Sequence, residues 1–249
     1  MKVILLAAGR GRRFGKRTVR LPKCLIPLSR GEDLLSRYLD SFRALKLRDV
    51  VLVVGHEKDR VIRACIEKGR GLSVKFLFNP RYEQGSIVSL FTAAHELTDD
   101  CLIMDADVYF QTNALGKLLK TPGSAFLLDP RSKSSGEEMM VMAPATKTSA
   151  GRRSLRPCRI SKRIDPRLCI IGEAVGFLKL KRSDALLLSD ILEKMVRQGK
   201  TGLEYEEAYN ELMKTRRVGF KKITGFWTEM DFEEDWAVIA RRAAPKQSM

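Results

Sequence analysis

The chain has 249 residues, with 46 Lys and Arg against 30 Asp and Glu and a formal net charge of +16. Hydrophobic residues make up 44% and charged residues 31%, which argues against a disordered chain and fits one globular domain, 1–249. The longest uncharged apolar run, residues 3–9, is too short to span a membrane, and the arginines after it argue against a secretory signal. We therefore expect a cytoplasmic protein without membrane insertion.

The first half of the chain alternates between predicted strands and helices. Short apolar runs predict strands at 2–7, 50–54, 74–78 and 101–104, and helical spacing of apolar residues predicts helices at 34–45, 61–68 and 86–97. A loop rich in glycine and arginine, 9–20, follows the first strand. This alternation is typical of right-handed βαβ units, so we predict a three-layer α/β fold around a mostly parallel, Rossmann-like sheet.

The second half is less regular. Its patterns predict strands at 123–128, 138–142, 170–180 and 220–227, helices at 183–198, 205–214 and 232–242, an exposed loop at 144–158 and a tail at 241–249. We expect this half to form an insertion beside the parallel sheet.

Cysteine and histidine are too sparse for several kinds of site. The five cysteines, at 24, 65, 101, 158 and 169, are odd in number and widely spaced, which argues against zinc ligation and a disulfide framework. We expect them to be reduced thiols. The two histidines, His56 and His95, lie near no nucleophile motif. The net charge favours an anionic partner, either nucleic acid or a nucleoside triphosphate, and charge alone does not separate the two.

Glycines and basic residues directly follow the first strand. Residues 6–13 read LAAGRGRR, and Pro22-Lys23 follows after eight intervening residues. Glycines after a buried strand let backbone N–H groups approach a phosphate, while Arg13 and Lys23 supply the positive charge that a triphosphate needs. The spacing matches neither a Walker A loop nor a Rossmann fingerprint. A tight turn with solvated arginines is the alternative, but the downstream Pro-Lys favours phosphate binding.

Two acidic clusters follow other predicted strands. Asp105 and Asp107 come at the carboxyl end of an apolar strand, where ligands bind in open α/β sheets, and Glu229 and Asp231 would share one face at the end of the last strand. Such carboxylates repel one another unless a cation lies among them, and Mg²⁺ prefers carboxylate and phosphate oxygens. The alternatives are an acidic turn at the first cluster and capping of the last helix by Asp231.

Together, these motifs resemble the nucleotidyltransferases with a GT-A-like fold. The signature is Leu6-Ala-Ala-Gly-x-Gly-x-Arg13 followed by Pro22-Lys23. Further stretches are similar to the CTP:phosphocholine cytidylyltransferase branch: Asn79-Pro-Arg-Tyr82 with Gly85-Ser-Ile-Val-Ser89-Leu, Asp105-Ala-Asp-Val108, Trp227-Thr-Glu-Met-Asp231 and residues 160–176. The resemblance covers residues 1 to 240.

The resemblance implies a Mg²⁺-dependent cytidylyltransferase that joins CMP from CTP to phosphocholine, 2-aminoethylphosphonate or a related phosphate or phosphonate ester. Residues 1–110 would mainly bind the nucleotide, and 111–240 the acceptor. The resemblance also implies nucleotide contacts, with Lys23 and Arg13 as the catalytic groups. The contact residues would be Leu6, Ala8, Gly9, Gly11, Arg13, Lys23, Gln84, Gly85, Ser86, Ser89 and Asp105. Asp107, Glu229 and Asp231 would bind Mg²⁺, and Tyr109, Lys162, Glu173, Tyr205 and Trp227 would contact the acceptor.

Several alternatives stay open at this point. Aromatic residues make up only 7%, and residues 129–140 contain no Trp or Tyr, which favours a primary amine or a neutral acceptor over the quaternary ammonium of choline. A sugar-1-phosphate nucleotidyltransferase would share the loop and the metal site. A nucleic-acid-binding protein with a vestigial fold is disfavoured, because it would not need the carboxylates. The oligomeric state is open, with a homodimer as one alternative.

Overall fold

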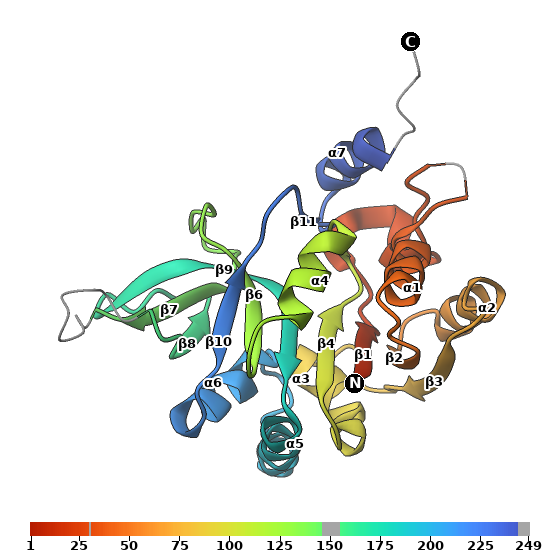
Figure 1. Ribbon diagram of the computed structural model, residues 1–249. Helices are drawn as coiled ribbons and strands as arrows, with labels where there is room; N and C mark the ends of the chain where they lie inside the picture. The colour runs from red at the N-terminus through yellow and green to blue at the C-terminus, as the bar shows by residue number, and fades with distance from the viewer. Residues whose placement is uncertain (30, 146–154, 244–249) are drawn as a thin grey trace.

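A sheet of nine strands organises the structure, a computed structural model that describes residues 1–29, 31–145 and 155–243 (Figure 1). The strands are β1 (Lys2–Ala7), β2 (Asp49–Val54), β3 (Ser73–Phe78), β4 (Cys101–Asp105), β6 (Ala125–Asp129), β7 (Met140–Pro144), β8 (Arg159–Ser161), β9 (Leu168–Leu180) and β10 (Gly219–Lys222). The main path runs β10-β6-β9-β4-β1-β2-β3, and β7 joins β9 to β8. On this path only β9 runs against its neighbours, so the predicted mostly parallel sheet is confirmed.

Helices cover both faces of this sheet and give the predicted three layers. They are the 3-10 turns η1 (Arg12–Val19), η2 (Lys23–Leu25) and η3 (Ala94–Glu96) and the α-helices α1 (Leu34–Ala44), α2 (Lys58–Lys68), α3 (Ser86–Thr92), α4 (Thr112–Leu119), α5 (Arg182–Arg197), α6 (Glu206–Thr215) and α7 (Glu233–Ala243). One core lies under α1, α2 and α4, and the other lies under α3, α5 and α6. A small antiparallel pair, β5 (Val108–Tyr109) with β11 (Thr228–Glu229), stands apart from the main sheet.

The strands β1, β2 and β4 are apolar at all positions but one, at an end of each strand, because both of their faces are buried. In β1, Val3 and Leu5 pack into the first core, whereas Ile4 and Leu6 pack into the second. Alternate side chains of a strand point to opposite faces, so a strand between two helical layers needs a continuous apolar run.

Several elements differ from the sequence predictions, among them the short strands β5 and β8, which were not predicted. Helix α4 was not predicted, because its eight residues place only Ala114, Leu115 and Leu118 in the core and include Gly116, which lowers helix propensity. The predicted helix 86–97 is interrupted, with α3 ending at Thr92 before η3. The predicted strand 220–227 is shorter, as β10. The predicted loop 144–158 and tail 241–249 lie partly outside the described residues.

The remaining sequence expectations concern thiols and membrane spans. All five cysteines are free, and burial raises the pKa of Cys65 and Cys101 to about 11. Within the ranges that the structure describes, no helix has the length and apolar character needed to cross a membrane.

We expect Glu96 to contribute to stability through two lysines from the sheet. Its side chain accepts a 2.7 Å hydrogen bond from Lys2 of β1 and another from Lys75 of β3, and these bonds lower the pKa of Glu96 to about 2. A carboxyl whose pKa is depressed on folding stabilises the protein above its unfolded pKa, and this contribution is lost as the pH falls from about 4.5 to about 2. Glu96→Gln should therefore lower the free energy of unfolding at pH 7 by up to about 3 kcal/mol.

Urea unfolding at pH 7 and pH 3 measures this effect. The difference between Glu96→Gln and the wild type should shrink at pH 3, while Glu67→Gln, at an exposed position of α2, should change little at either pH. An equal loss at both pH values would contradict the ionic contribution.

Candidate active site

Two loops leave neighbouring strands side by side at the carboxyl edge of the sheet. β1 and β4 pair in parallel, with Leu6 opposite Asp105, so the glycine-rich loop and the acidic turn begin next to each other. The hydroxyl of Tyr38, a fully buried side chain, lies 2.5 Å from the carbonyl oxygen of Asp105 and 2.9 Å from that of Val108. This contact holds both ends of the turn that carries Asp107.

Gly11 lets the Lys23 side chain pass against the glycine-rich loop. The backbone of Gly11 is left-handed, with φ of 66°, and a Cβ there would lie 2.8 Å from Lys23 Cγ and 2.9 Å from its Cε. Any other residue would be strained and would displace the lysine. At Gly9, by contrast, nothing lies within 4 Å of the corresponding position. The backbone of Gly9 is therefore open to the cavity.

The ammonium of Lys23 lies between two carboxylates. Its Nζ is 2.5 Å from Oδ1 of Asp231 and 3.3 Å from Oδ2 of Asp107, and Arg13 Nη2 is 2.9 Å from the other oxygen of Asp231. Burial disfavours the charged lysine, but the two carboxylates outweigh this effect and raise the pKa of Lys23. Lys23 thus supplies a cation among carboxylates that would otherwise repel one another.

Main-chain pairing brings the second acidic cluster beside the first. β11 lies against β5 with Glu229 opposite Val108, and the backbone N–H of Met230 donates to the carbonyl oxygen of Asp107 at 2.9 Å. Met230 is fully buried, while its neighbours Glu229 and Asp231 both line the cavity. The alternation along this segment therefore directs both carboxylates to the site.

Asp235, and not Asp231, accepts hydrogen bonds from the backbone at the start of α7. Its Oδ2 accepts from the N–H of Asp231 at 3.0 Å and from that of Phe232 at 2.8 Å. The side chain of Asp231 is directed instead to Lys23 and Arg13. The capping alternative for Asp231 is therefore wrong.

Negative charge is crowded in the site. Burial, followed by the charges of Asp107 and Asp231, raises the pKa of Glu229 to about 8. Burial, followed by the charge of Asp107, raises the pKa of Asp105 well above its usual value, although the Tyr205 hydroxyl donates to its carboxyl group. An added cation would relieve this crowding.

A cavity of about 370 Å³ at this edge brings together most of the predicted residues. It is lined by Leu6, Ala8, Gly9, Arg13, Gln84, Gly85, Ser86, Ser89, Asp105, Asp107, Lys162, Tyr205, Glu229 and Asp231. Gly11 and Lys23 line a small adjoining cavity of about 60 Å³ that shares Leu6, Gly9 and Asp107 with it. The cavity thus gathers residues from both halves of the chain.

The loop between α5 and α6 closes one wall of this cavity. Gly85 N donates to the carbonyl of Thr201 at 2.9 Å, and Ile87 N donates to that of Leu203 at 3.1 Å. A Cβ at Gly85 would lie 2.1 Å from the carbonyl oxygen of Leu203, so only glycine allows this approach. Ser86 Oγ also donates to Glu204 at 2.6 Å. The predicted nucleotide segment is therefore supported by the second half of the chain.

A second large cavity, of about 330 Å³, adjoins the first and is strongly acidic. It is lined by Arg13, Asp129, Ser132, Glu137, Glu138, Glu173, Trp227, Thr228, Glu229, Asp231, Phe232 and Asp235. Trp227 Nε1 donates to Asp129 Oδ2 at 2.7 Å, and Arg131 binds the same carboxylate through Nε at 2.9 Å and Nη2 at 2.8 Å. Burial and its neighbours Glu138 and Asp129 raise the pKa of Glu173.

Tyr109 is the predicted site residue that lines none of these three cavities. Its ring is buried, packs against Phe226 and lies under the guanidinium of Arg37, at 4.3 Å. It therefore belongs to the core behind β5 and does not border the cavities in which an acceptor contact was expected.

The structure adds lining residues that the motifs did not indicate. These are Asp129, Glu137, Glu138 and Ser132 on the acidic side, and Met139 on the other. Asp129 ends β6, which runs parallel to β4, so the rule that indicated Asp105 could also have found it. Glu137 carries no such signal, and reaches the site by pairing with Arg13 and Lys162, at 3.5 Å each.

Whether the cavity could hold a metal ion depends on the carboxylate oxygens that border it. Among the residues that the structure describes, no three Asp, Glu, His or Cys side chains converge as a ready metal cluster. Asp107, Glu229 and Asp231 nevertheless border the same cavity. Mg²⁺ commonly takes only one or two carboxylates and completes its shell with phosphate oxygens and water, so the donor set fits this ion in the presence of a nucleotide.

Curated relatives are similar to part of the chain. The CMP-5'-(3-aminopropyl)phosphonate synthase of Streptomyces rubellomurinus is 29% identical over 123 residues, which cover 49% of this chain and 19% of that protein. The choline-phosphate cytidylyltransferase of Haemophilus influenzae is 28% identical over 144 residues, which cover 57% of this chain and 58% of that protein. The match thus spans less than two thirds of either relative.

Solved structures share the whole fold. The CTP:phosphocholine cytidylyltransferase of Streptococcus pneumoniae superposes with a TM-score of 0.73 at 18% identity, covering 98% of this chain and 99% of that chain. A UDP-glucose pyrophosphorylase of Acinetobacter baumannii superposes with a TM-score of 0.72 at 14% identity, covering 97% and 92%. These likenesses show a common fold.

The glycine-rich loop, Lys23, Asp105 and Asp107 all fall within the segment that a family model matches, residues 3–153, described as a MobA-like NTP transferase domain. This match spans more than half of the chain and confirms the resemblance to nucleotidyltransferases. The chain belongs to the MobA-like NTP transferase domain family.

Proposed function

We propose that this chain is a cytidylyltransferase that transfers CMP from CTP to a small phosphate or phosphonate monoester and releases pyrophosphate. The observation that best supports the proposal is the pair of adjoining cavities, which share Arg13, Glu137, Glu229 and Asp231 as a common wall. In this proposal, residues 1–110 mainly hold the nucleotide and 111–240 mainly hold the acceptor within one domain. The names of the two curated relatives favour cytidine and small phosphorus acceptors.

In the proposed reaction, an oxygen of the acceptor attacks the α-phosphorus of CTP at the shared wall. A new P–O bond forms, the bond from the α-phosphorus to the bridging oxygen breaks, and pyrophosphate leaves with that electron pair. The attacking oxygen is already ionised near neutral pH, so no general base is required. Lys23 and Arg13 would neutralise the charge that develops on the phosphates, and the loop at Gly9 would offer backbone N–H groups.

We propose Mg²⁺ as the metal partner of the nucleotide, held by Asp107, Glu229 and Asp231 together with phosphate oxygens. When bound, the ion supplies charge neutralisation and orientation of the triphosphate. Lys23 now pairs with two of these carboxylates, so its ammonium would be free to move to a phosphate when the metal binds them.

The acidic cavity favours an acceptor that carries an amine. Asp129, Glu137, Glu138 and Glu173 surround it, with Arg13 at the wall toward the nucleotide cavity. A phosphate or phosphonate group could therefore meet Arg13 while an ammonium group points among the carboxylates. Trp227 is the only tryptophan of this cavity, which fits a primary amine better than a fully methylated one.

The proposal is tested by pyrophosphate release with Mg²⁺. CTP, UTP, ATP and GTP would each be combined with phosphocholine, 2-aminoethylphosphonate, a hydroxyalkyl phosphonate and hexose 1-phosphates. Release with CTP and an amine-bearing acceptor is expected. Release with UTP and a hexose 1-phosphate would instead support a sugar-1-phosphate nucleotidyltransferase, the second candidate, which the likeness to the UDP-glucose pyrophosphorylase favours.

We expect Trp227→Leu to weaken acceptor binding selectively. The ring borders the acidic cavity, and cation–π contact with an ammonium group contributes about 1–2 kcal/mol when desolvated. The KM for the acceptor should therefore rise about tenfold while the KM for CTP stays unchanged. Trp227→Phe keeps a ring but loses the bond to Asp129, and should retain more affinity than the leucine variant. An equal rise in both KM values would contradict this assignment.

A further inference from the structure

An arm of the sheet, formed by β7, β8 and the first part of β9, extends beyond the main path (left in Figure 1). Its inner face packs on the second core through Val141 and Ile160. The next row across the three strands, adjacent to Val141 and Ile160, consists of Arg159, Met142 and Ile170. Because side chains alternate along a strand, this row points to the outer face.

A turn between β8 and β9 completes this outer face. The backbone N–H of Asp165 donates to the sulfur of Met142 at 3.4 Å, so the turn lies over the row and exposes Arg163 and Ile164. Asp165 is the only acidic residue in 155–170. Arg167 binds both of its oxygens, at 2.9 and 2.8 Å, which neutralises this single negative charge.

The basic face is therefore formed by Arg159, Arg163 and Arg167 with Ile164 and Ile170. Within the described part of the chain, neither Arg159 nor Arg163 forms an ion pair. Ile164 is 39% exposed and Ile170 is 44% exposed. The face thus combines free positive charge with exposed aliphatic side chains.

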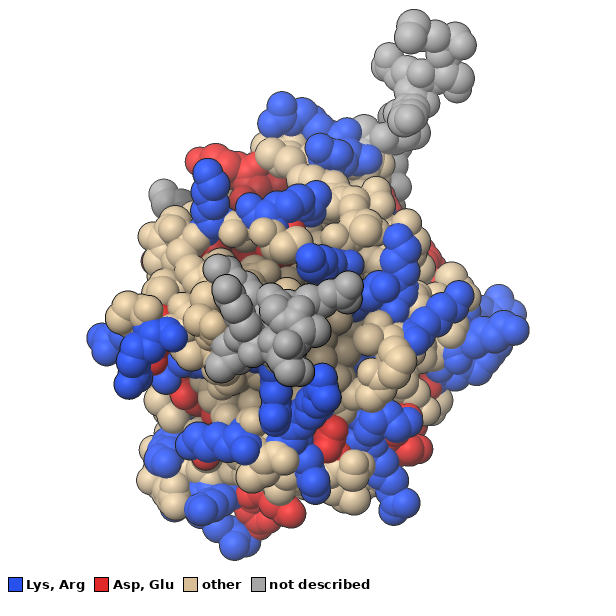
Figure 2. Space-filling model, turned by 60° about the vertical axis from the view of Figure 1, so that its left-hand side comes forward, with Lys and Arg blue, Asp and Glu red and all other residues tan. Residues whose placement is uncertain are grey.

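The end of α6 brings further basic residues to the edge of the arm. Arg156 Nη2 donates to the carbonyl oxygen of Arg216 at 3.4 Å, and Arg216 and its neighbour Arg217 are exposed, although Arg216 also pairs with Asp184 at 3.4 Å. Because α6 packs on the inner face of the arm, these arginines lie beside the basic face and not on it. Figure 2, in which the left-hand side of Figure 1 comes forward, shows Lys and Arg side chains distributed over this side of the molecule.

We propose that the basic face docks on an anionic phospholipid surface. Arginines would pair with headgroup phosphates, and Ile164 and Ile170 would enter the boundary between headgroups and acyl chains. Residues 130–170 contain no Phe, Tyr or Trp, so the face has no ring on which a nucleobase could stack. Exposed isoleucines beside arginines therefore favour lipid over nucleic acid. This proposal is independent of the nucleotide and acceptor assigned above.

Vesicle co-sedimentation of the full chain tests the proposal. The probes are phosphatidylcholine vesicles with and without 40% phosphatidylglycerol, at about 0.1 M salt. The wild type should sediment with the anionic vesicles alone. Arg159→Gln with Arg163→Gln should partition about thirtyfold more weakly, which corresponds to about 2 kcal/mol for two basic residues. The double variant Ile164→Ser with Ile170→Ser should partition onto the anionic vesicles about tenfold more weakly than the wild type.

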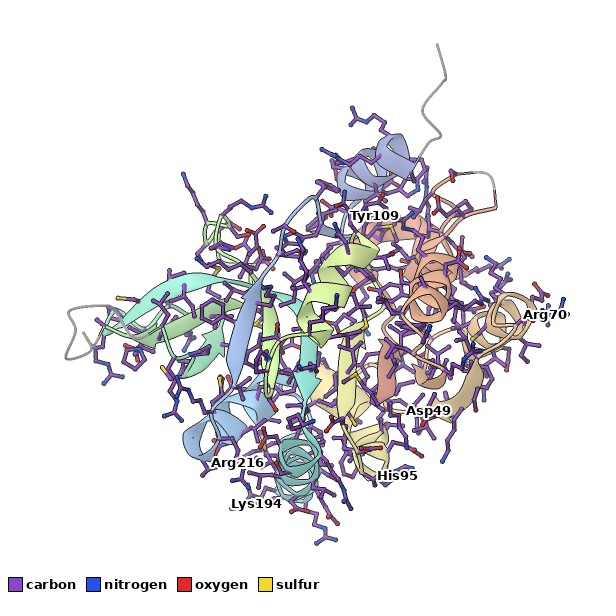
Figure 3. All side chains as sticks on the ribbon, in the orientation of Figure 1. Asp49, Arg70, His95, Tyr109, Lys194 and Arg216 are labelled. Atoms are coloured by element: carbon purple, nitrogen blue, oxygen red, sulfur yellow. The ribbon has the colours of Figure 1, made fainter. Side chains whose placement is uncertain are left out.

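The matched control removes two arginines from the far side of the molecule. Arg63→Gln with Arg70→Gln changes exposed charges on and after α2, at the opposite end of the sheet (Figures 1 and 3), and should leave partitioning within twofold of the wild type. Equal losses in the arm and control variants would overturn the proposal, because they would indicate only a response to net charge. No binding of the wild type to anionic vesicles would also overturn it, as would tight binding to duplex DNA that the arm variant loses without any change on vesicles.

Discussion

Asp107→Asn should reduce nucleotidyl transfer at least a thousandfold while leaving the fold intact. Asp107 lies at the end of the turn after β4, borders the nucleotide cavity and pairs with Lys23 at 3.3 Å. The amide would be a weaker ligand for Mg²⁺ and would no longer hold the lysine, so the charge of the triphosphate would be less well neutralised. The side chain is 36% exposed, so we expect the free energy of unfolding to change by less than about 1 kcal/mol.

Pyrophosphate release at saturating CTP and Mg²⁺ measures this effect, with urea unfolding as the test of the fold. Asp49→Asn is the matched control, since Asp49 is an exposed carboxylate at the start of β2, at the opposite edge of the sheet (Figure 3). Near wild-type turnover of Asp107→Asn would remove Asp107 from the proposed metal site.

Lys23→Met should lower kcat by about a hundredfold to a thousandfold, because a preorganised positive charge would be lost where negative charge develops. The variant should also be less stable. Lys23 is buried between Asp107 and Asp231, and removal of one member of a buried ion pair leaves the partner's charge less well compensated, at a cost of about 3 kcal/mol. Turnover per folded molecule and urea unfolding separate the two effects.

Lys179→Met provides the comparison for Lys23. Lys179 is also buried, but it lies on β9 and donates to the carbonyl oxygens of Leu119 and Thr121. This variant should lose stability and keep its activity per folded molecule. If Lys23→Met behaved in the same way, the role of Lys23 would be structural only.

The strands and loops around the nucleotide cavity could be predicted because their signals are local. β1 and β4 are continuous apolar runs, and a parallel sheet places the residues that follow such runs at one edge. This rule was enough to indicate the glycine-rich loop and Asp107. Glu229 and Asp231 were indicated by the alternation of side chains at the end of a predicted strand. In the structure Glu229 lies in the short strand β11, outside the main sheet, and Asp231 follows it.

The acidic cavity was harder to predict because its residues meet through long-range contacts. Glu137 and Glu138 precede β7, Glu173 lies within β9, and Asp129 ends β6, and no spacing in the sequence connects them. Tyr109 shows the opposite error. The family resemblance implied an acceptor contact at Tyr109, but pairing of β5 with β11 and packing against Phe226 place its ring in the core.

The position of β9 has a consequence for the order in which the chain can fold during synthesis. β9 lies between β4 and β6 and pairs with both, yet its residues, 168–180, are made long after those of either neighbour. Until the ribosome has released them, β4 has one edge without its partner, and β6 has neither partner, because its other neighbour, β10, is made later still. The segment 3–153 that carries the family match ends before this point. A nascent chain of that length would expose one edge of β4 and both edges of β6, which are sites of mispairing. Synthesis of β9 closes the edge of β4 and one edge of β6, and β10 closes the other.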